Sequence, residues 1–107
     1  MVSFDPATGS EAAKVRPAVI VSNNTANAAA TRAGGVVTVV PVTSNISRVY
    51  PFQVLLPAAS TGLPRDSKAQ AEQLRSVSVT RITDAAGWLT TELMHELDDA
   101  VRVHLAL

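Results

Sequence analysis

The chain has 107 residues, of which 47% are hydrophobic, and this apolar content suffices for one domain built around a single core. It contains no cysteine, which excludes a disulfide framework, a thiolate metal site and a cysteine nucleophile. No run approaches the roughly 18 apolar residues of a membrane span, and the first residues do not resemble a signal peptide. We therefore expect a single domain over residues 1–107, located in the cytoplasm.

The net charge of zero hides an uneven distribution. Residues 1–83 carry eight of the nine lysines and arginines and four acids, whereas residues 84–107 carry one arginine and five acids. The first part thus has a formal charge of +4 and the second of −4. This asymmetry favours an anionic partner for the first part, although a solvated charged surface gives the same count.

The first predicted strand is short, because Pro6 ends it after residues 2–5. Residues 15–21 then form a β-branched run that is typical of a buried strand. Pro17 lacks an N–H for the sheet and keeps the preceding residue extended, so it holds Arg16 at the beginning of this strand. An arginine in that position is either a solvated surface residue or part of a site.

The middle of the chain alternates short strands with polar turns. Residues 23–33, rich in alanine, favour a short helix. An uninterrupted β-branched run predicts a strand over residues 36–40 that ends at Pro41. The next expected elements are a strand at 52–56, a loop at 58–64 and a strand at 76–80. Short strands at this spacing indicate a small antiparallel barrel or a strongly twisted sheet.

The last element is an amphipathic helix over residues 91–105, because its apolar residues recur at intervals of three and four. Thr90 is the predicted N-cap, and Glu92 lies in the first turn. His95 and His104 are nine residues apart on this helix, which places them on opposite faces at about 100° per residue. They therefore cannot share one site; His95 is expected in solvent and His104 in packing beside the apolar stripe.

The chemistry that remains lies in arginines, carboxylates, hydroxyls and amides near strand ends. Guanidinium groups bind phosphate oxygens as a fork and stay charged, while hydroxyls and amides recognise phosphates and base edges. This set suits RNA, whose own 2′-hydroxyl attacks the neighbouring phosphate once charge on the phosphoryl oxygens is stabilised. No metal or other cofactor is then needed. The groups are Ser10, Glu11 and Arg16; Thr43, Ser44 and Asn45; and Arg65, Asp66, Lys68, Glu72, Gln73 and Arg75.

Four short motifs follow one another along the chain: Gly9-Ser10-Glu11 with Arg16-Pro17, Val40-Pro41-Val42-Thr43-Ser44, Tyr50-Pro51-Phe52, and Glu72-Gln73-Leu74-Arg75-Ser76-Val77. In this order and spacing, the chain resembles the MazF/PemK-type toxin endoribonucleases. The resemblance implies an SH3-like small antiparallel barrel with a C-terminal helix, and a homodimer. It also implies metal-independent cleavage of single-stranded RNA at short sequences and neutralisation by a MazE-like antitoxin.

The resemblance further implies catalytic roles for Arg16 and Thr43, with Glu11 as the acidic loop residue for orientation or acid–base support. Arg16 would stabilise the charge that develops on the phosphorane and help to protonate the departing 5′ oxygen. A guanidinium that stays charged is a poor general base, so proton abstraction is not assigned to it. Thr43 would position the scissile phosphate or hydrogen-bond the attacking 2′-hydroxyl. The expected products are a 2′,3′-cyclic phosphate and a 5′-hydroxyl.

Further polar residues are candidates for RNA binding. Those expected to hold RNA directly are Ser10, Ser44, Asn45 and Gln73. Those expected to attract it over a longer range, in a salt-dependent way, are Lys14, Arg48 and Lys68. The aromatic residues expected in the core rather than stacked on bases are Phe4, Tyr50, Phe52 and Trp88.

One departure from the family pattern is the short first strand within residues 1–6. Either the natural start lies upstream, or the barrel is completed with a shortened edge strand. Two other functions stay open: a non-enzymatic toxin of the same fold, such as a CcdB-like gyrase poison, and an inactive homologue that only binds an antitoxin. The ending His104-Leu105-Ala106-Leu107 lacks the Trp-Gly-Ile of gyrase poisons, which favours the ribonuclease.

Overall fold

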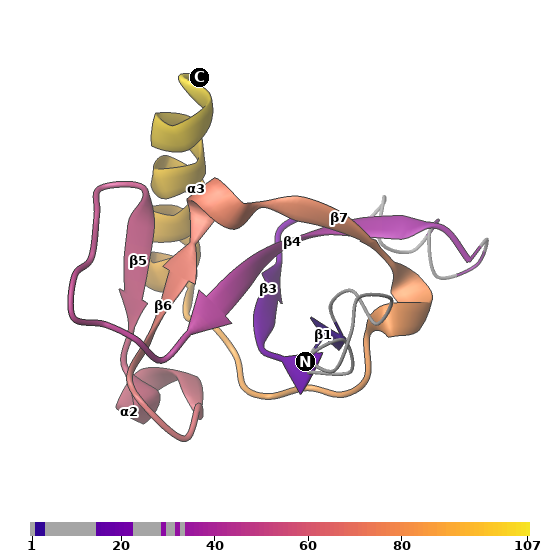
Figure 1. Ribbon diagram of the computed structural model, residues 1–107, viewed down its shortest axis with the longest axis horizontal. Helices are drawn as coiled ribbons and strands as arrows, with labels where there is room; N and C mark the ends of the chain where they lie inside the picture. The colour runs from indigo at the N-terminus through magenta and orange to yellow at the C-terminus, as the bar shows by residue number, and fades with distance from the viewer. Residues whose placement is uncertain (1, 4–14, 23–28, 30–31, 33) are drawn as a thin grey trace, which may run out of the picture.

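The computed structural model describes residues 2–3, 15–22, 29, 32 and 34–107, and Figure 1 shows how their helices and strands are arranged. Within these residues, β1 (Val2–Ser3) and β2 (Val15–Arg16) form a small antiparallel ladder. A second sheet contains β3 (Ala18–Ile20), β4 (Val36–Thr43), β5 (Gln53–Leu56), β6 (Ser67–Gln70) and β7 (Arg75–Ser78). The helices whose residues are all described are α2 (Ala58–Thr61), which precedes β6, and α3 (Thr91–Leu105) near the C-terminus.

The prediction of a mainly antiparallel β fold with a C-terminal helix is confirmed. The strand order is β3–β4–β6–β5, and β7 pairs with the first half of β4. Among the described strands the sheet does not close on itself, so the fold is barrel-like and open. Figure 1 shows β4 crossing the middle of the molecule, and α3 packs against β5.

The longest strand, β4, continues through Pro41, so the prediction that it ends at this proline is wrong. The register explains why. The Val42 N–H donates to the Pro17 carbonyl (3.0 Å), so the backbone N–H and C=O groups of even-numbered residues in β4 point toward β3. The backbone nitrogen of Pro41 points toward the opposite edge of β4. On that edge, β4 changes from pairing with β7 to pairing with β6, and residues 71–73 between these two strands form a 3₁₀ turn. The missing N–H of Pro41 therefore costs no hydrogen bond between strands.

Strand β4 contributes to two hydrophobic clusters, one on each of its faces. The cluster between the sheet and α3 includes Val40, Val42, Leu56 and Leu97. The cluster on the other face is formed by Val37, Val39 and Val77. Because successive side chains point to opposite faces and both faces are covered, the strand has a continuous apolar sequence rather than an alternating one.

Two segments differ from the sequence-based predictions. Residues 58–64 contain the one-turn helix α2 instead of being loop throughout, and the helix ends at Gly62 in the left-handed conformation (φ 74°). The strand predicted at 76–80 lies earlier, at β7, because Val79–Arg81 forms a 3₁₀ turn. The helix predicted over residues 23–33 lies largely outside the described residues. Within this range the structure describes Ala29 and Arg32, and both are helical.

The C-terminal helix α3 has the predicted bounds, Thr91–Leu105. Its predicted N-cap is confirmed, since the Thr90 hydroxyl oxygen accepts a hydrogen bond from the Leu93 N–H (3.1 Å). Leu97 and Ala100 are buried against the sheet. No helix in the part of the chain that the structure describes is long and apolar enough to cross a membrane.

Residues 82–89 connect the 3₁₀ turn after β7 to α3, and the Trp88 N–H fastens this connection to the Thr61 carbonyl at the end of α2 (2.9 Å). Gly87 permits this approach, because a Cβ there would lie 2.1 Å from the Thr61 carbonyl oxygen. The Trp88 ring lies over Gly62, but the residue is 64% exposed. The prediction that Trp88 belongs to the core is therefore wrong.

Two other aromatic residues, Tyr50 and Phe52, lie in and near the loop that precedes β5. Tyr50 stacks on Phe52, with ring centroids 5.2 Å apart, and Phe52 is half-buried while Tyr50 is 41% exposed. Phe4 lies outside the described residues. His104 is exposed rather than partly buried, although its ring lies 6.5 Å from that of Phe52; His95 is exposed as predicted.

Candidate functional site

Arg16 and Thr43 line the same cavity, although they are far apart in the sequence. Arg16 is the last residue of β2, and the following Pro17 offers its carbonyl to the Val42 N–H (3.0 Å). This hydrogen bond holds the end of β2 beside the end of β4, where Thr43 is the last residue. The pairing of two strand ends thus brings the two side chains together.

The cavity has a volume of about 290 Å³. The residues that line it are Arg16, Pro17, Val42, Thr43, Ser44, Leu63, Pro64, Arg65 and Ser67. Two of these nine residues are arginines, three carry hydroxyls and none is acidic. Guanidinium and hydroxyl donors without a carboxylate in this lining favour an anion, and their geometry suits phosphate oxygens.

Thr43 is held in a defined orientation by its neighbours. The residue is half-buried at the end of β4 and pairs with Lys68 of β6. Its hydroxyl oxygen accepts a hydrogen bond from the Asn45 N–H (3.2 Å). Because that interaction uses an acceptor position, the hydroxyl hydrogen remains to be donated to a bound anion.

The predicted RNA contacts are distributed unevenly around this cavity. Ser44 is exposed and lines it. Asn45 does not, and its side-chain oxygen accepts hydrogen bonds from the N–H (3.3 Å) and hydroxyl (3.0 Å) of Ser47. Gln73 is exposed at the end of the 3₁₀ turn and lies outside the lining. The remaining loop candidates, Ser10, Glu11 and Lys14, lie outside the described residues.

The two described cations proposed for long-range attraction have partners within the fold. Lys68 is only 8% exposed, and its ammonium donates to the Arg48 carbonyl (2.6 Å). The Arg48 guanidinium donates to the Tyr50 hydroxyl (3.2 Å) and lies 5.6 Å from the centre of that ring. Neither residue lines the cavity, and their contribution to RNA attraction stays a prediction.

A polar bridge joins two of the sequence motifs. The Gln53 side chain accepts a hydrogen bond from the Tyr50 N–H (3.1 Å) and donates to a Glu72 carboxylate oxygen (2.8 Å). The other Glu72 oxygen is buried without a partner among the described residues. The bridge fixes the loop before β5 against the 3₁₀ turn, so Glu72 serves the fold here.

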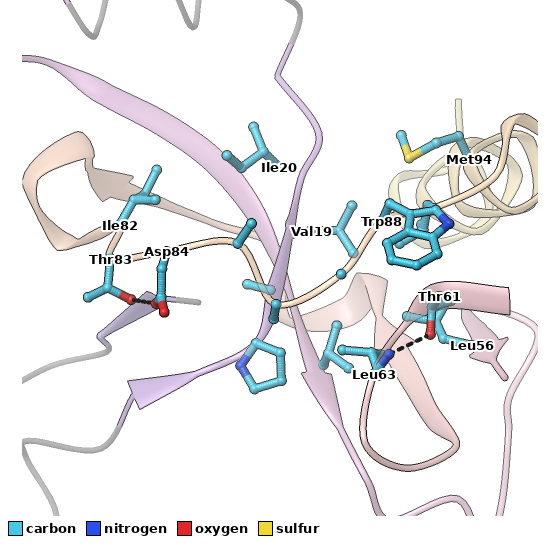
Figure 2. A pocket seen from close by; sticks show the side chains of 17 residues that line it. Val19, Ile20, Leu56, Thr61, Leu63, Ile82, Thr83, Asp84, Trp88 and Met94 are labelled. Atoms are coloured by element: carbon cyan, nitrogen blue, oxygen red, sulfur yellow. Dashed lines mark hydrogen bonds between the residues drawn. The ribbon is translucent and has the colours of Figure 1, made fainter. Parts of the chain in front are cut away.

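A second cavity, of about 540 Å³, adjoins the first, because Pro17, Val42 and Leu63 line both. Figure 2 shows it between β3 and the connection to α3, with Ile20 and Trp88 on its walls. The described residues of its lining include neither lysine nor arginine. The carboxylate of Asp84, hydrogen-bonded by the Thr83 hydroxyl (2.7 Å), also lines it. This mainly apolar lining with a carboxylate is less suited to a phosphate than the lining of the first cavity.

Within the described residues, no group of three histidines, cysteines or acids is placed to hold a metal ion. His95 and His104 line neither cavity. The described polar side chains that line the cavity with Arg16 carry guanidinium nitrogens and hydroxyls, which donate hydrogen bonds to anions.

The family model described as "PemK-like, MazF-like toxin of type II toxin-antitoxin system" matches residues 1–105. The chain belongs to this family. It is 58% identical to endoribonuclease MazF9 of Mycobacterium tuberculosis (strain ATCC 25618 / H37Rv) over 107 residues, which cover 99% of this chain and 91% of the relative.

Solved structures of MazF toxins share the fold. Mycobacterium tuberculosis toxin MazF-mt6 gives a TM-score of 0.76 at 22% identity and covers 88% of this chain and 89% of that chain. A MazE–MazF structure from Deinococcus radiodurans (Form-I) gives a TM-score of 0.68 at 26% identity and covers 86% of this chain and 83% of that chain.

In this MazF-like toxin, sequence reasoning did not assign Arg65 and Ser67 to the site, although both line the cavity with Arg16 and Thr43. The sequence placed Arg65 among the polar residues near strand ends but gave it no catalytic or RNA-binding role. It follows Pro64 in a loop whose sequence has no helical or strand periodicity. Its position depends on how α2 and the loop fold back against β4. The only local signal was a cation just before a strand.

Proposed function

We propose that this MazF-like toxin is an endoribonuclease that cleaves single-stranded RNA at short sequences without a metal ion. One observation carries the proposal. In a chain 58% identical to an endoribonuclease, Arg16 and Thr43 line one cavity, and the described residues of its lining include cations and hydroxyls but no acid. A phosphodiester matches these donors in charge and geometry.

The reaction is an internal transfer at phosphorus. The 2′-oxygen of the substrate attacks the adjacent phosphorus, and the bond from phosphorus to the 5′ oxygen breaks. The 2′-hydroxyl loses its proton and the departing 5′ oxygen gains one, so the products are a 2′,3′-cyclic phosphate and a 5′-hydroxyl. The protein's task is to stabilise charge and to guide these protons.

Arg16 stabilises the charge that grows on the non-bridging oxygens during attack. It is exposed to the cavity at the end of β2, where Pro17 and its bond to β4 restrict the backbone. A guanidinium donates two hydrogen bonds in one plane, so it can hold a phosphoryl oxygen and also protonate the leaving 5′ oxygen through the same fork.

Thr43 donates its hydroxyl hydrogen to the scissile phosphate, since its oxygen already accepts from the Asn45 N–H. Ser44, on the same cavity wall, binds a neighbouring part of the RNA backbone or its 2′-hydroxyl. Glu11 lies outside the described residues, and we assign it the acid–base or orienting role. The remaining RNA contacts proposed from sequence are Ser10, Lys14, Asn45, Arg48, Lys68 and Gln73.

We further propose a MazE-like antitoxin as the neutralising partner. The support is the MazE–MazF structure from Deinococcus radiodurans, whose toxin shares the fold of this chain at 26% identity. An antitoxin that covers the cationic cavity would exclude RNA, and an acidic segment would match the arginines there. Because the substrate is cellular RNA, we place the protein in the cytoplasm, as one domain over residues 1–107.

The protein is proposed to act as a homodimer. Strand β5 and helix α3 are in contact, and they carry large apolar side chains that remain exposed in the single chain. These are Leu55 at 44%, Val103 at 57% and Leu105 at 46% exposure. Large apolar side chains gathered on adjoining elements are typical of protein interfaces. Sedimentation of the wild type and of Leu55→Asp tests this: the wild type should be a dimer, and the variant more monomeric.

The alternative of a gyrase poison or an inactive antitoxin-binding homologue is not favoured. The curated relative at 58% identity is an endoribonuclease, and the chain retains both Arg16 and Thr43 in one cavity. The decisive experiment incubates the purified protein with mixed single-stranded RNA in EDTA and maps the product ends. Cleavage with cyclic phosphate ends supports the proposal. Intact RNA, together with bound antitoxin, would establish the alternative.

A further inference from the structure

We propose that Arg65 is a second phosphate-binding residue, which holds a non-bridging oxygen of the scissile phosphate together with Arg16. The inference rests on the proposed ribonuclease function and adds to it a residue outside the four sequence motifs. It follows from the position of Arg65 in the cavity that contains Arg16 and Thr43.

The backbone of Arg65 is fixed on both sides. The carboxylate of the next residue, Asp66, accepts a hydrogen bond from the Ala58 N–H (2.8 Å) and so ties the loop to the start of α2. The buried Ser67 hydroxyl donates to the Arg65 carbonyl (3.0 Å). The loop therefore presents the arginine from a defined position, which lowers the conformational entropy lost when it binds a ligand.

The guanidinium of Arg65, in contrast to its backbone, has hydrogen-bond donors that are available to a ligand. The residue is exposed, and within the described part of the chain its guanidinium makes no ion pair or hydrogen bond with another residue. Arg48 and Arg102 differ, because the former donates to Tyr50 and the latter pairs with Asp99 (3.0 Å). A guanidinium without a partner, in a cavity without acids in its described lining, is suited to an anion.

A second arginine adds to the charge stabilisation that Arg16 supplies during the reaction. When the 2′-oxygen attacks, the phosphoryl group gains negative charge on two non-bridging oxygens. Arg16 also serves the leaving oxygen, so its fork is divided between two tasks. A second guanidinium that binds one non-bridging oxygen strengthens as the charge grows, and it therefore stabilises the transition state more than the bound substrate.

The experiment compares Arg65→Ala and Arg65→Lys with a control, Arg102→Ala, which removes an equal charge from outside the cavity. We expect Arg65→Ala to lower kcat/KM by about 10²-fold, mainly through kcat, as for the loss of one oxyanion donor. Arg65→Lys should recover only part, because an ammonium lacks the planar fork. Arg102→Ala should leave cleavage unchanged. Thermal unfolding should match the wild type for all variants, since both arginines are exposed.

A phosphorothioate at the cleaved bond adds a readout at the level of one atom. Sulfur in place of the oxygen that Arg65 binds should slow the wild type, and this slowing should shrink in Arg65→Ala for one diastereomer only. Equal slowing in wild type and variant for both diastereomers would overturn the proposal. So would full recovery by Arg65→Lys, because the residue would then act only as a distant charge.

A binding measurement separates failure of this inference from failure of the proposed function. An oligonucleotide with a 2′-deoxy nucleotide at the cleavage position cannot react, so its affinity is measured without cleavage. For Arg65→Ala the slope of log affinity against log salt should fall by about 0.7, the value for one phosphate contact of a single strand. An unchanged slope overturns the role of Arg65 even if the wild type cleaves RNA. Inert wild-type protein overturns the ribonuclease instead.

Discussion

The two adjoining cavities of this molecule differ in chemistry more than in position. The larger, about 540 Å³, is mainly apolar and has Asp84 as the one charged side chain among its described residues, whereas the smaller, about 290 Å³, contains Arg16 and Arg65. Pro17, Val42 and Leu63 form a common wall. The smaller cavity is therefore the better site for an anionic substrate, because of its charge and hydrogen-bonding groups and despite its smaller volume.

Apart from this common wall, the two linings draw on different parts of the structure. The apolar cavity is bounded by residues of the hydrophobic cluster, such as Val42 and Leu56, and by Gly87 of the connection to α3. The arginines of the smaller cavity are exposed and are not members of that cluster. Replacing apolar residues of the larger cavity should therefore lower stability, whereas replacing polar residues of the smaller cavity should lower activity.

The largest effect is expected at Arg16, on the cationic side of the comparison. Arg16→Ala should reduce RNA cleavage by about 10³-fold, because it removes the main donor to the developing charge. The free energy of unfolding should stay within about 0.5 kcal/mol of the wild type, as for other exposed residues. Cleavage kinetics and urea unfolding measure the two quantities. Substantial cleavage by the variant would remove Arg16 from the site.

Leu56 gives the matching test on the apolar side. The side chain is fully buried between the sheet and α3, so Leu56→Ala should lower the free energy of unfolding by about 2–5 kcal/mol. At a temperature where the variant remains folded, its kcat/KM should stay close to that of the wild type. A selective loss of cleavage without loss of stability would contradict the division between the cavities.

Thr43 should show an intermediate effect on activity. Thr43→Ala removes a hydrogen bond to a charged phosphate, worth about 1.5–3 kcal/mol, so cleavage should fall by about 10- to 100-fold. Thr43→Ser keeps the hydroxyl and the acceptor for the Asn45 N–H, and most activity should return. If serine and alanine were equally impaired, packing of the methyl group rather than the hydroxyl would explain the loss.

The smallest of these effects is expected at Gly87, which lines the apolar cavity. A Cβ at this position would lie 2.1 Å from the Thr61 carbonyl oxygen, which accepts the Trp88 N–H. Gly87→Ala should therefore displace the connection and destabilise the fold by about 1–3 kcal/mol. Thermal unfolding measures this, with Ala85→Ser on the same segment as a mild control. An unchanged melting temperature would show that the connection moves freely.

Local patterns predicted the elements whose stability is local. The bounds of α3 follow from apolar spacing and a cap at Thr90, both of which operate within a few residues. Pro41 shows the limit of this reasoning, because a proline ends a strand or continues it depending on which neighbour its edge faces. Trp88 was likewise predicted to lie in the core, but it is exposed in the segment where Gly87 packs closely against the Thr61 carbonyl.

The sequence by itself determined the family, the mainly antiparallel fold with its C-terminal helix, and the pair Arg16 and Thr43 as candidates. These depend on residue types at fixed spacing, which can be compared along the chain. Only the tertiary structure decided that Arg65 lines the same cavity and that Lys68 is buried against the Arg48 carbonyl. The physical reason is that a charged side chain acts through its neighbours in space, and the register of β4 with β6 and β3 sets those neighbours.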